Sequence, residues 1–415
     1  MTYHLRRSFS SLEVPNYRRY FLGQLVSLSG TWMQTVAAVW LILTLTDSGI
    51  AVGLTTALQF LPMLLFGAWG GLIADRMSKR RLLIVTQALM MVPAIGLLVV
   101  TATGVVTPWM VYLGVFGFGL LNAIDNPTRQ SFVIEMVGPD RVVNAVSLNS
   151  VIVQAARIVG PAVAGILIAT VGVVPCFALN ALTFVAMILA LSRMDPARLQ
   201  EPPVAEREPG AIRAGLRYVI RTPELAVPLA LMALVGTLGF NFQVVLPLLA
   251  KFSFDGGAMA YGALVSAMAV GSIAGALITG HHGRTGPKLI AGGALAFGVS
   301  ALGAAAMPTL ALEIPLLVLL GGAAVTFAAT INSSLQLAVA PEMRGRVMAL
   351  YSVVFLGSTP IGAPLVGWLS QTYDPRAALL LAGISGLAAA WAARASFNRI
   401  SERAAAKGRS LAAAS

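Results

Sequence analysis

The sequence predicts an all-α membrane protein with twelve transmembrane helices, arranged as two six-helix bundles. Three observations support this fold class. Of the 415 residues, 57% are hydrophobic and only 11% are charged, against about a quarter charged in an ordinary soluble domain. Charge-free runs recur at the length of about 20 residues that a spanning helix needs, and the basic residues gather in alternate loops. This composition excludes a soluble enzyme, and the one cysteine, Cys176, excludes an internal disulfide.

The charge-free runs set the helix boundaries. Two runs are too long for one span and are divided near Pro108 and between Gly172 and Pro175. Backbone groups inside a bilayer must satisfy their own hydrogen bonds, so the runs are helices. The expected spans are 20–44, 50–73, 82–103, 108–128, 143–171, 174–192, 225–250, 260–280, 288–306, 313–337, 347–371 and 377–394.

A polar, proline-containing stretch divides the chain into two halves with six expected spans each. The halves repeat at an offset of 202, as in Gly160 with Gly362 and Gly165 with Gly367. Two parallel six-helix repeats are a known plan of transporters, in which the substrate path lies between the repeats. The expected domains are an N-terminal bundle at 1–192, a cytoplasmic linker at 193–222, a C-terminal bundle at 223–396 and a cytoplasmic tail at 397–415.

The distribution of Lys and Arg predicts the orientation in the membrane. With a cytoplasmic N-terminus, only Lys251 and Arg376 fall in outer loops and only Arg157 falls within a span. This agrees with the positive-inside rule. The net charge of +12 is therefore a topology signal, and we expect no nucleic-acid partner. We expect a multi-pass protein of the cell (inner) membrane, in contact with the lipid bilayer, with both termini in the cytoplasm.

The loop between the second and third spans carries the most specific motif. It reads Gly70-Gly71-Leu72-Ile73-Ala74-Asp75-Arg76-Met77-Ser78-Lys79-Arg80-Arg81. A glycine at a helix end lets another helix approach, and the Asp can accept from a helix N-terminus or pair with an arginine. The loop resembles the signature loop of the major facilitator superfamily, with Ser78 where that family usually has glycine. We expect a conformational latch made of Gly71, Asp75, Arg76, Lys79, Arg80 and Arg129.

The resemblance covers nearly the whole chain. The chain is similar to the drug-exporter group that includes macrolide efflux and enterobactin exporter proteins, in segments such as 16–23, 127–130 and 344–347. The resemblance implies the major facilitator fold and transport by alternating access. One departure is Leu113, which stands where many proton-coupled drug exporters carry an arginine. Proton coupling through that arginine is therefore not expected.

Asp125 and Arg157 are the candidates for coupling. Asp125 is the one carboxylate inside an expected span, and Arg157 is the one basic residue. Ionisable groups in a membrane span are costly and are functional candidates by default. Two readings stay open for Asp125, a functional role and a structural ion pair, and both can hold, since a pair that opens during transport is a switch. It lies four residues before Arg129, which suits a structural ion pair, and it could also be the counter-ion of Arg157 on the next helix.

Small and polar residues mark further candidates. Gly160, Pro161 and Gly165 resemble a glycine-proline motif of the superfamily's exporters and suit close helix packing. Polar residues within the spans could either face a substrate cavity or join neighbouring helices. The cavity candidates are Gln34, Gln59, Asn122, Asn180, Asn241, Gln243, Asn332 and Gln336.

The function expected is a secondary active transporter that exports amphipathic small molecules of the drug or siderophore type by proton-coupled antiport. Uptake of a metabolite on the same fold is the alternative. The phosphate-binding motif for ATP is absent, and His281 and His282 lie in a glycine-rich loop without further metal ligands. We therefore expect no cofactor, no metal and no enzymatic activity, and a monomer whose partners are a small-molecule substrate and protons.

Overall fold

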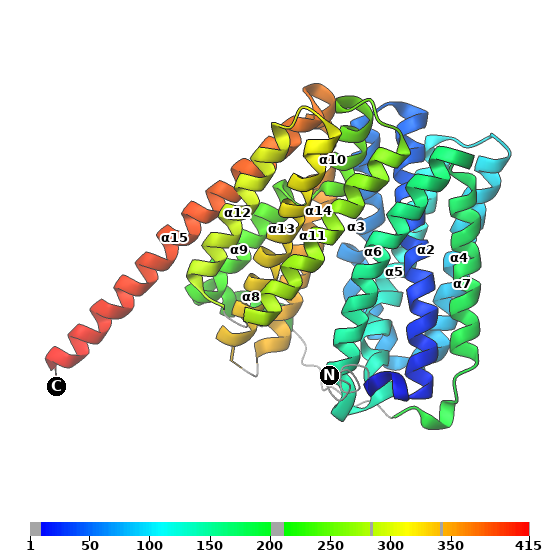
Figure 1. Ribbon diagram of the computed structural model, residues 1–415. Coiled ribbons are helices and arrows are strands. Elements are labelled where there is room, and N and C mark those ends of the chain that lie inside the picture. The colour runs from blue at the N-terminus through cyan, green and yellow to red at the C-terminus, as the bar shows by residue number, and fades with distance from the viewer. Residues whose placement is uncertain (1–9, 201–210, 283–284, 341–342, 415) are drawn as a thin grey trace, which may run out of the picture. The chain divides into compact units, whose positions relative to one another are not determined.

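The computed structural model describes residues 10–200, 211–282, 285–340 and 343–414. These residues are almost entirely helical (Figure 1), and they contain twelve helical segments long and apolar enough to span a membrane. The all-α membrane fold that the sequence predicts is confirmed. The side chains of His281 and His282 and the whole of Glu342 lie outside the described residues.

The elements follow one another without strands in the described part of the chain. In order they are η1 (Ser10–Glu13), α2 (Pro15–Thr46), α3 (Gly49–Arg76), α4 (Lys79–Ala102), α5 (Pro108–Val137), η2 (Pro139–Arg141), α6 (Val142–Val171), α7 (Val174–Ser192), η3 (Pro196–Arg198), α8 (Ala211–Arg221), α9 (Pro223–Leu238), α10 (Phe242–Leu248), the π-helical turn η4 (Leu249–Ser253), α11 (Ala258–His282), α12 (Pro287–Ala305), α13 (Leu310–Ala338), α14 (Arg344–Thr372) and α15 (Pro375–Ala414).

Several helices extend beyond the expected apolar runs. The fourth span was expected to end at residue 128, but α5 continues to Val137 and ends only at Gly138, whose φ is 73°. That left-handed conformation favours glycine. Hydrophobicity marks the part of a helix that lies in lipid, and it does not mark where the hydrogen-bonded backbone stops. The extension brings Glu135 into the helix, so Asp125 is not the only carboxylate of this span.

The seventh span is interrupted, although the sequence predicts one helix at 225–250. Helix α9 ends at Leu238 and α10 begins at Phe242. Gly239 and Asn241 lie in the break, and the Asn241 side chain donates a hydrogen bond of 2.7 Å to the Thr237 carbonyl oxygen. A side chain that bonds a backbone carbonyl in this way competes with the regular helical pattern.

Helices also occur where polar connections were expected. The stretch expected to link the two halves contains η3 and the eleven-residue helix α8. The last helix, α15, runs from Pro375 to Ala414 and so includes the described part of the expected tail. Hydropathy predicted the apolar first part of α15, but it did not predict α8 or the continuation of α15 into the expected tail, because these segments are polar.

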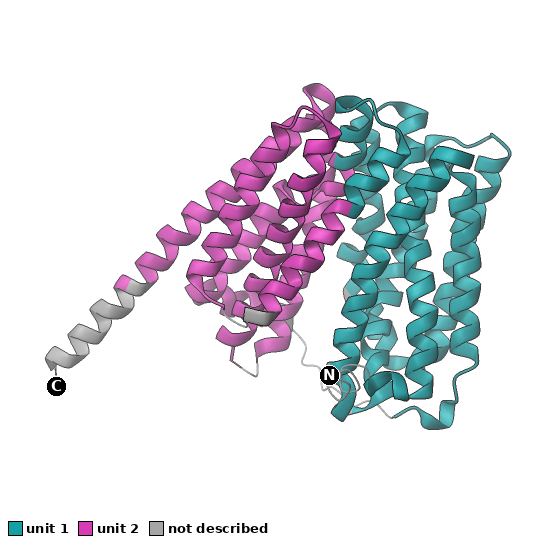
Figure 2. Cartoon of the chain, viewed as in Figure 1, with its two compact units in different colours: residues 1–205, 246–266 teal, residues 206–245, 267–415 magenta. Residues whose placement is uncertain are grey.

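The chain forms two compact units (Figure 2). The first contains Met1–Ala205 with Leu246–Ser266, and the second contains Glu206–Val245 with Ala267–Ser415. Residues of the start of α11 belong to the first unit because they pack on its helices. Tyr261 stacks on Trp40 of α2 with 6.1 Å between ring centroids. The domain boundaries expected from the sequence stay a prediction.

Each unit repeats the same close helix crossings at the offset of 202. A Cβ atom added at Gly119 of α5 would lie 2.2 Å from a carbonyl oxygen of α3, and one added at Gly321 of α13 would lie 2.1 Å from a carbonyl oxygen of α11. Likewise, a Cβ at Gly160 of α6 would lie 2.6 Å from a carbonyl oxygen of α2, and one at Gly362 of α14 would lie 1.9 Å from one of α9. Such approaches allow only glycine, and small residues let membrane helices pack closely.

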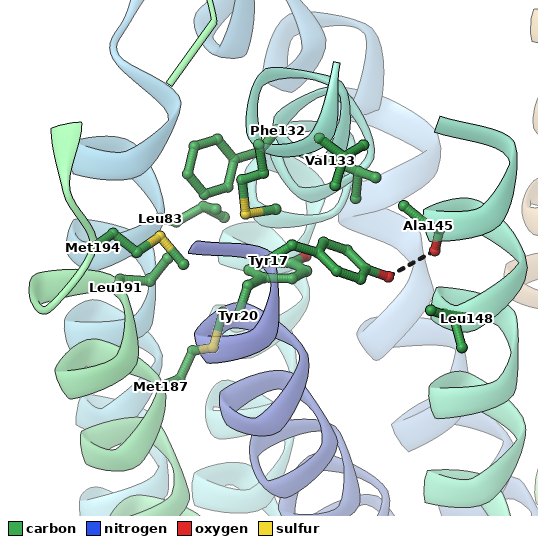
Figure 3. Packing of buried hydrophobic residues seen from close by; sticks show 12 residues of the cluster. Tyr17, Tyr20, Leu83, Phe132, Val133, Ala145, Leu148, Met187, Leu191 and Met194 are labelled. Carbon is green, nitrogen blue, oxygen red and sulfur yellow. Dashed lines mark hydrogen bonds between the residues drawn. The ribbon is translucent and has the colours of Figure 1, made fainter. Parts of the chain in front are cut away.

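A buried cluster of aromatic residues and methionines holds one end of the first unit together (Figure 3). Tyr17 and Tyr20 of α2 pack there with Phe132 of α5 and Met187 of α7. The Tyr17 hydroxyl donates a hydrogen bond of 2.7 Å to the Ala145 carbonyl oxygen of α6. This cluster positions α2 and α5 beside the ionisable groups described next.

Candidate functional site

Asp125 is the centre of a buried polar cluster in the first unit. Its side chain forms an ion pair with Arg129, one turn further along α5. From α4, the Thr86 hydroxyl donates to Asp125 Oδ1 at 2.6 Å and the Gln87 amide donates to the same oxygen at 3.0 Å. Both carboxylate oxygens are therefore satisfied, and Asp125 is only 3% exposed. The spacing of four residues that suits an ion pair does produce one here.

The cluster joins three helices. The side-chain oxygen Oε1 of Gln87 accepts a hydrogen bond of 3.2 Å from the Ser27 hydroxyl of α2, and Tyr20 of α2 lies within electrostatic reach of Arg129. The sequence analysis missed Thr86 and Gln87. The available signal was two consecutive polar residues within an otherwise apolar span, a pattern that hydrogen bonds between helices explain.

Arg157 is not the partner of Asp125. The Arg157 guanidinium lies over the ring of Trp32 of α2, 5.0 Å from the ring centroid. Its Nε atom is buried and has no hydrogen-bond partner among the described residues. The suggestion that Asp125 is the counter-ion of Arg157 is therefore wrong for this structure, because Arg129 occupies the Asp125 carboxylate.

The residues expected to form a latch are spread over several contacts. Asp75 and Arg76 are exposed in the last turn of α3. Arg80 donates to the carbonyl oxygens at the C-terminal end of α7, at 2.7 Å from Leu191 and 2.8 Å from Ser192. A basic side chain there satisfies carbonyl groups that the helix leaves unpaired.

Lys79 is buried rather than part of an exposed loop. It is the first residue of α4 and forms an ion pair with Glu135 of α5, with the two side chains 5% and 10% exposed. Glu135 was missed because the fourth span was expected to end before it. The pair attaches the start of α4 to the end of α5.

The close contact at the end of α3 is made by Gly70 and not by Gly71. A Cβ added at Gly70 would lie 2.1 Å from the Ala123 carbonyl oxygen of α5, whereas an added Cβ at Gly71 meets nothing within 4 Å. Of the two adjacent glycines, Gly70 therefore permits the approach of α5 in this structure.

The expected helix-packing motif lies where α6 contacts two helices. Gly160 faces α2, as described above. A Cβ added at Gly165 would lie 3.1 Å from the Ala258 carbonyl oxygen of α11, and one added at Gly262 of α11 would lie 2.8 Å from the Pro161 carbonyl oxygen. All these contacts lie within the first unit.

Polar residues proposed for a substrate cavity join helices in the first unit. The Asn180 amide of α7 donates to Gln34 of α2 at 2.6 Å, and both side chains are buried. The Gln59 amide of α3 donates to the Thr35 hydroxyl of α2 at 3.3 Å. Asn122 is half-buried in α5.

In the second unit, Gln336 donates to Asn332 within α13 at 2.5 Å. Asn241 is 2% exposed, and the side-chain oxygens of Asn241 and Gln243 are buried without hydrogen-bond partners among the described residues. They lie beside an aromatic group in which Phe240 contacts Phe297, Phe327 and Phe355, at 5.3, 6.4 and 6.3 Å between ring centroids. Available acceptors next to aromatic surface are features of a small-molecule site.

An apolar groove of about 520 Å³ lies between α2, α6 and α7 in the first unit. Gly30 and Gly160 contribute to its lining, and the hydroxyls of Ser29 and Thr183 are its polar groups. None of the residues expected to line a substrate cavity contributes to it. Among the described residues, no three or more His, Cys, Asp or Glu side chains are grouped so that they could hold a metal ion.

Solved transporter structures share this fold. A bacterial homologue of the human lysosomal transporter Spinster, in an inward-facing and unoccupied conformation, matches with a TM-score of 0.71 at 15% identity, over 92% of this chain and 94% of that one. The nucleoside transporter NupG matches with a TM-score of 0.71 at 15% identity, over 92% and 99% of the two chains.

Curated relatives are similar in sequence. The enterobactin exporter EntS of Shigella boydii is 26% identical over 376 residues, which cover 89% of this chain and 88% of the relative. The staphyloferrin A transporter of Staphylococcus aureus is 25% identical over 260 residues, which cover 62% of this chain and 65% of the relative.

The family assignment covers more of the chain than either relative. Residues 6–411 match the transmembrane secretion effector family, and the structural matches are to transporters of the major facilitator superfamily. The protein is thus a multi-pass membrane transporter of twelve spans in the described chain and not an enzyme. It belongs to the transmembrane secretion effector family of the major facilitator superfamily.

Proposed function

We propose that this protein is a secondary active transporter that exports amphipathic small molecules, of the drug or siderophore type, in exchange for protons. The observation that carries the proposal is the buried Asp125, held by Arg129, Thr86 and Gln87 inside a spanning helix. The similarity to an enterobactin exporter and to a staphyloferrin A transporter supports the siderophore type.

The coupling step follows from the contacts of Asp125. A proton that binds the carboxylate removes its negative charge and so weakens the ion pair with Arg129. The Thr86 hydroxyl and the Gln87 amide remain as neutral partners. Release of Arg129 also changes its interaction with Tyr20 of α2, and a changed contact between α5 and α2 favours the other state of an alternating-access cycle. Return of the proton to water on the opposite side restores the pair.

The orientation and assembly are part of the proposal. Both termini lie in the cytoplasm, as the basic residues at the ends of alternate spans indicate. The transporter is a monomer in the inner membrane and needs no cofactor, because the gradient of protons supplies the free energy.

Transport in proteoliposomes tests the function. Purified protein is assayed for counterflow against a panel of hydrophobic drugs and siderophores, with and without an imposed pH gradient, beside protein-free vesicles. We expect counterflow of at least one amphipathic compound and accumulation only when the pH gradient is present. Accumulation that ignores the pH gradient contradicts proton coupling.

Direction is tested in cells, where uptake is the competing function. We expect cells that express the transporter to accumulate less of the counterflow substrate than cells without it, and dissipation of the proton gradient to remove the difference. Greater accumulation in the expressing cells would show that the transporter works as an importer.

A further inference from the structure

Arg157 is half-buried, and it differs from two other basic side chains of the first unit that are buried or half-buried. Arg129 is paired with Asp125, and Lys79 is paired with Glu135. None of the ion pairs within the described residues includes Arg157. Its Nε atom is nevertheless buried without a hydrogen-bond partner in that part of the chain.

The Trp32 ring compensates part of the positive charge of Arg157 but accepts none of its directed hydrogen bonds. Its face lies 5.0 Å from the guanidinium carbon, a favourable contact for a cation. A ring face accepts no directed hydrogen bond from the edges of the guanidinium, which carries five N–H donors. A cation in a membrane span is costly unless a partner compensates its charge. The contacts among the described residues therefore leave this charge unbalanced.

The position of Arg157 suits a ligand. The residue lies on α6 one turn before Gly160, where α6 crosses α2 so closely that a Cβ at Gly160 would lie 2.7 Å from Trp32 Cβ. That crossing holds the Trp32 ring in place beside the guanidinium. Gln154, also half-buried, precedes Arg157 by three residues and shares its face of the helix. A flat apolar surface, a cation and an amide are thus brought together within one unit.

We propose that Arg157 and Trp32 bind the anionic group of the transported molecule, so that the substrate class is an amphipathic organic anion with a carboxylate or an ionised phenol. The planar guanidinium matches such oxygens with paired, charge-assisted hydrogen bonds. Trp32 supports the apolar part of the ligand next to that group. The inference rests on the proposed transport function, since it names the substrates of the same transporter.

Binding to the purified full-length protein tests the site with a matched pair of probes. Naphthoate is an aromatic carboxylate, and naphthamide has the same rings with a neutral amide. Equilibrium dialysis measures the affinity for each, with protein-free micelles as the blank. We expect naphthoate to bind roughly tenfold more tightly than naphthamide, the scale of a hydrogen bond to a charged group. Equal affinities for the two probes would overturn the proposal.

Variants test whether Arg157 and Trp32 cause the preference for naphthoate over naphthamide. Arg157→Gln is expected to lose the preference for naphthoate, and Arg157→Lys to retain part of it. The control is Arg198→Gln, which makes the same charge change at an exposed arginine and keeps the full preference. Trp32→Leu is expected to weaken naphthoate binding roughly threefold. If Arg157→Gln still prefers naphthoate, the proposal is overturned. If Arg157→Gln fails to fold, the test passes to Trp32→Leu, and naphthoate binding as tight as that of the wild type then overturns the proposal.

The result separates this inference from the proposed function. An active exporter that binds both probes equally keeps its function and loses only this site. A protein that binds naphthoate through Arg157 but moves no substrate in the proteoliposome assay keeps the site and loses the function.

Discussion

Asp125 is buried with both carboxylate oxygens bonded, and its proposed role as the proton carrier can be tested by changing its charge alone. One oxygen accepts from Thr86 and Gln87, and the other pairs with Arg129. An asparagine at this position has nearly the same shape and retains a carbonyl oxygen as acceptor. It carries no charge and exchanges no proton at working pH.

Asp125→Asn is therefore expected to abolish export driven by a pH gradient while counterflow of the same substrate survives. Both assays are made on one purified preparation, with Asp140→Asn, a neutralised exposed acid, as the control. If Asp125→Asn still concentrates substrate under an imposed pH difference, another group carries the proton. Glu313 of α13 would then be examined, because it is fully buried and both its oxygens lack hydrogen-bond partners in the described residues.

The ion pair of Lys79 with Glu135 should contribute to stability much more than an exposed pair. Glu135→Ala leaves Lys79 as an uncompensated buried charge, which costs about 3–5 kcal/mol of unfolding free energy. Arg198→Ala breaks a pair whose side chains are 64% and 46% exposed, for which about 0–1 kcal/mol is expected. Thermal unfolding of the purified variants in detergent measures both effects.

A double variant completes the comparison at this pair. Lys79→Met combined with Glu135→Leu removes both charges and is expected to recover most of the loss in unfolding temperature. A Glu135→Ala protein as stable as the wild type would show that the pair is solvated in the membrane-bound protein.

At the scale of the elements, the crossing of α3 and α5 depends on glycine in both helices. Gly70 of α3 faces the Ala123 carbonyl oxygen of α5, and Gly119 of α5 faces the Gln59 carbonyl oxygen of α3. Gly117, two residues before Gly119 in the same helix, has nothing within 4 Å of an added Cβ. The two positions of α5 therefore provide a matched test of the packing.

Gly119→Ala is expected to destabilise the protein by about 1–3 kcal/mol, the usual cost of overpacking. Gly117→Ala is expected to be neutral or slightly stabilising, because alanine favours the helix over glycine. Unfolding temperatures and the fraction of monodisperse protein report the difference. Equal effects at the two positions would mean that α3 and α5 lie further apart than the structure shows.

The loop between α3 and α4 allows a test of the latch. Asp75→Asn should leave membrane insertion intact and slow transport, because the expected latch loses its one carboxylate. The control is Asp255→Asn, at an exposed position with φ of 48°, a conformation that asparagine also adopts readily. Initial rates in proteoliposomes separate the two variants. If the Asp75→Asn protein transports at the wild-type rate, the basic loop serves only to set the orientation in the membrane.

At the scale of the whole molecule, the orientation in the membrane that the basic residues predict can be tested by labelling. The background is Cys176→Ser, which removes the one cysteine, a buried residue. Cysteines at Ser48 and Asp374 should react with impermeant thiol reagents from outside the cell, and cysteines at Ser78 and Glu342 only from inside. A swap of these two pairs would overturn the orientation derived from charge.

The sequence by itself determined the class of fold, the number of spans and the family. These features depend on composition summed over about 20 residues at a time, and the bilayer imposes that length on every span. It also offered the pairing of Asp125 with Arg129 as one of the open readings, since both lie on one helix at a spacing that brings their side chains together. Local regularities of this kind do not depend on where other helices lie.

The tertiary structure alone decided which distant groups meet. Thr86 and Gln87 reach Asp125 from another helix, Glu135 reaches Lys79, and Arg157 rests on Trp32. Spacing along the chain carries no information about these contacts, because they depend on the rotation and crossing of packed helices. Those crossings depend in turn on single glycines where one backbone touches another, and hydropathy does not distinguish such glycines from their neighbours.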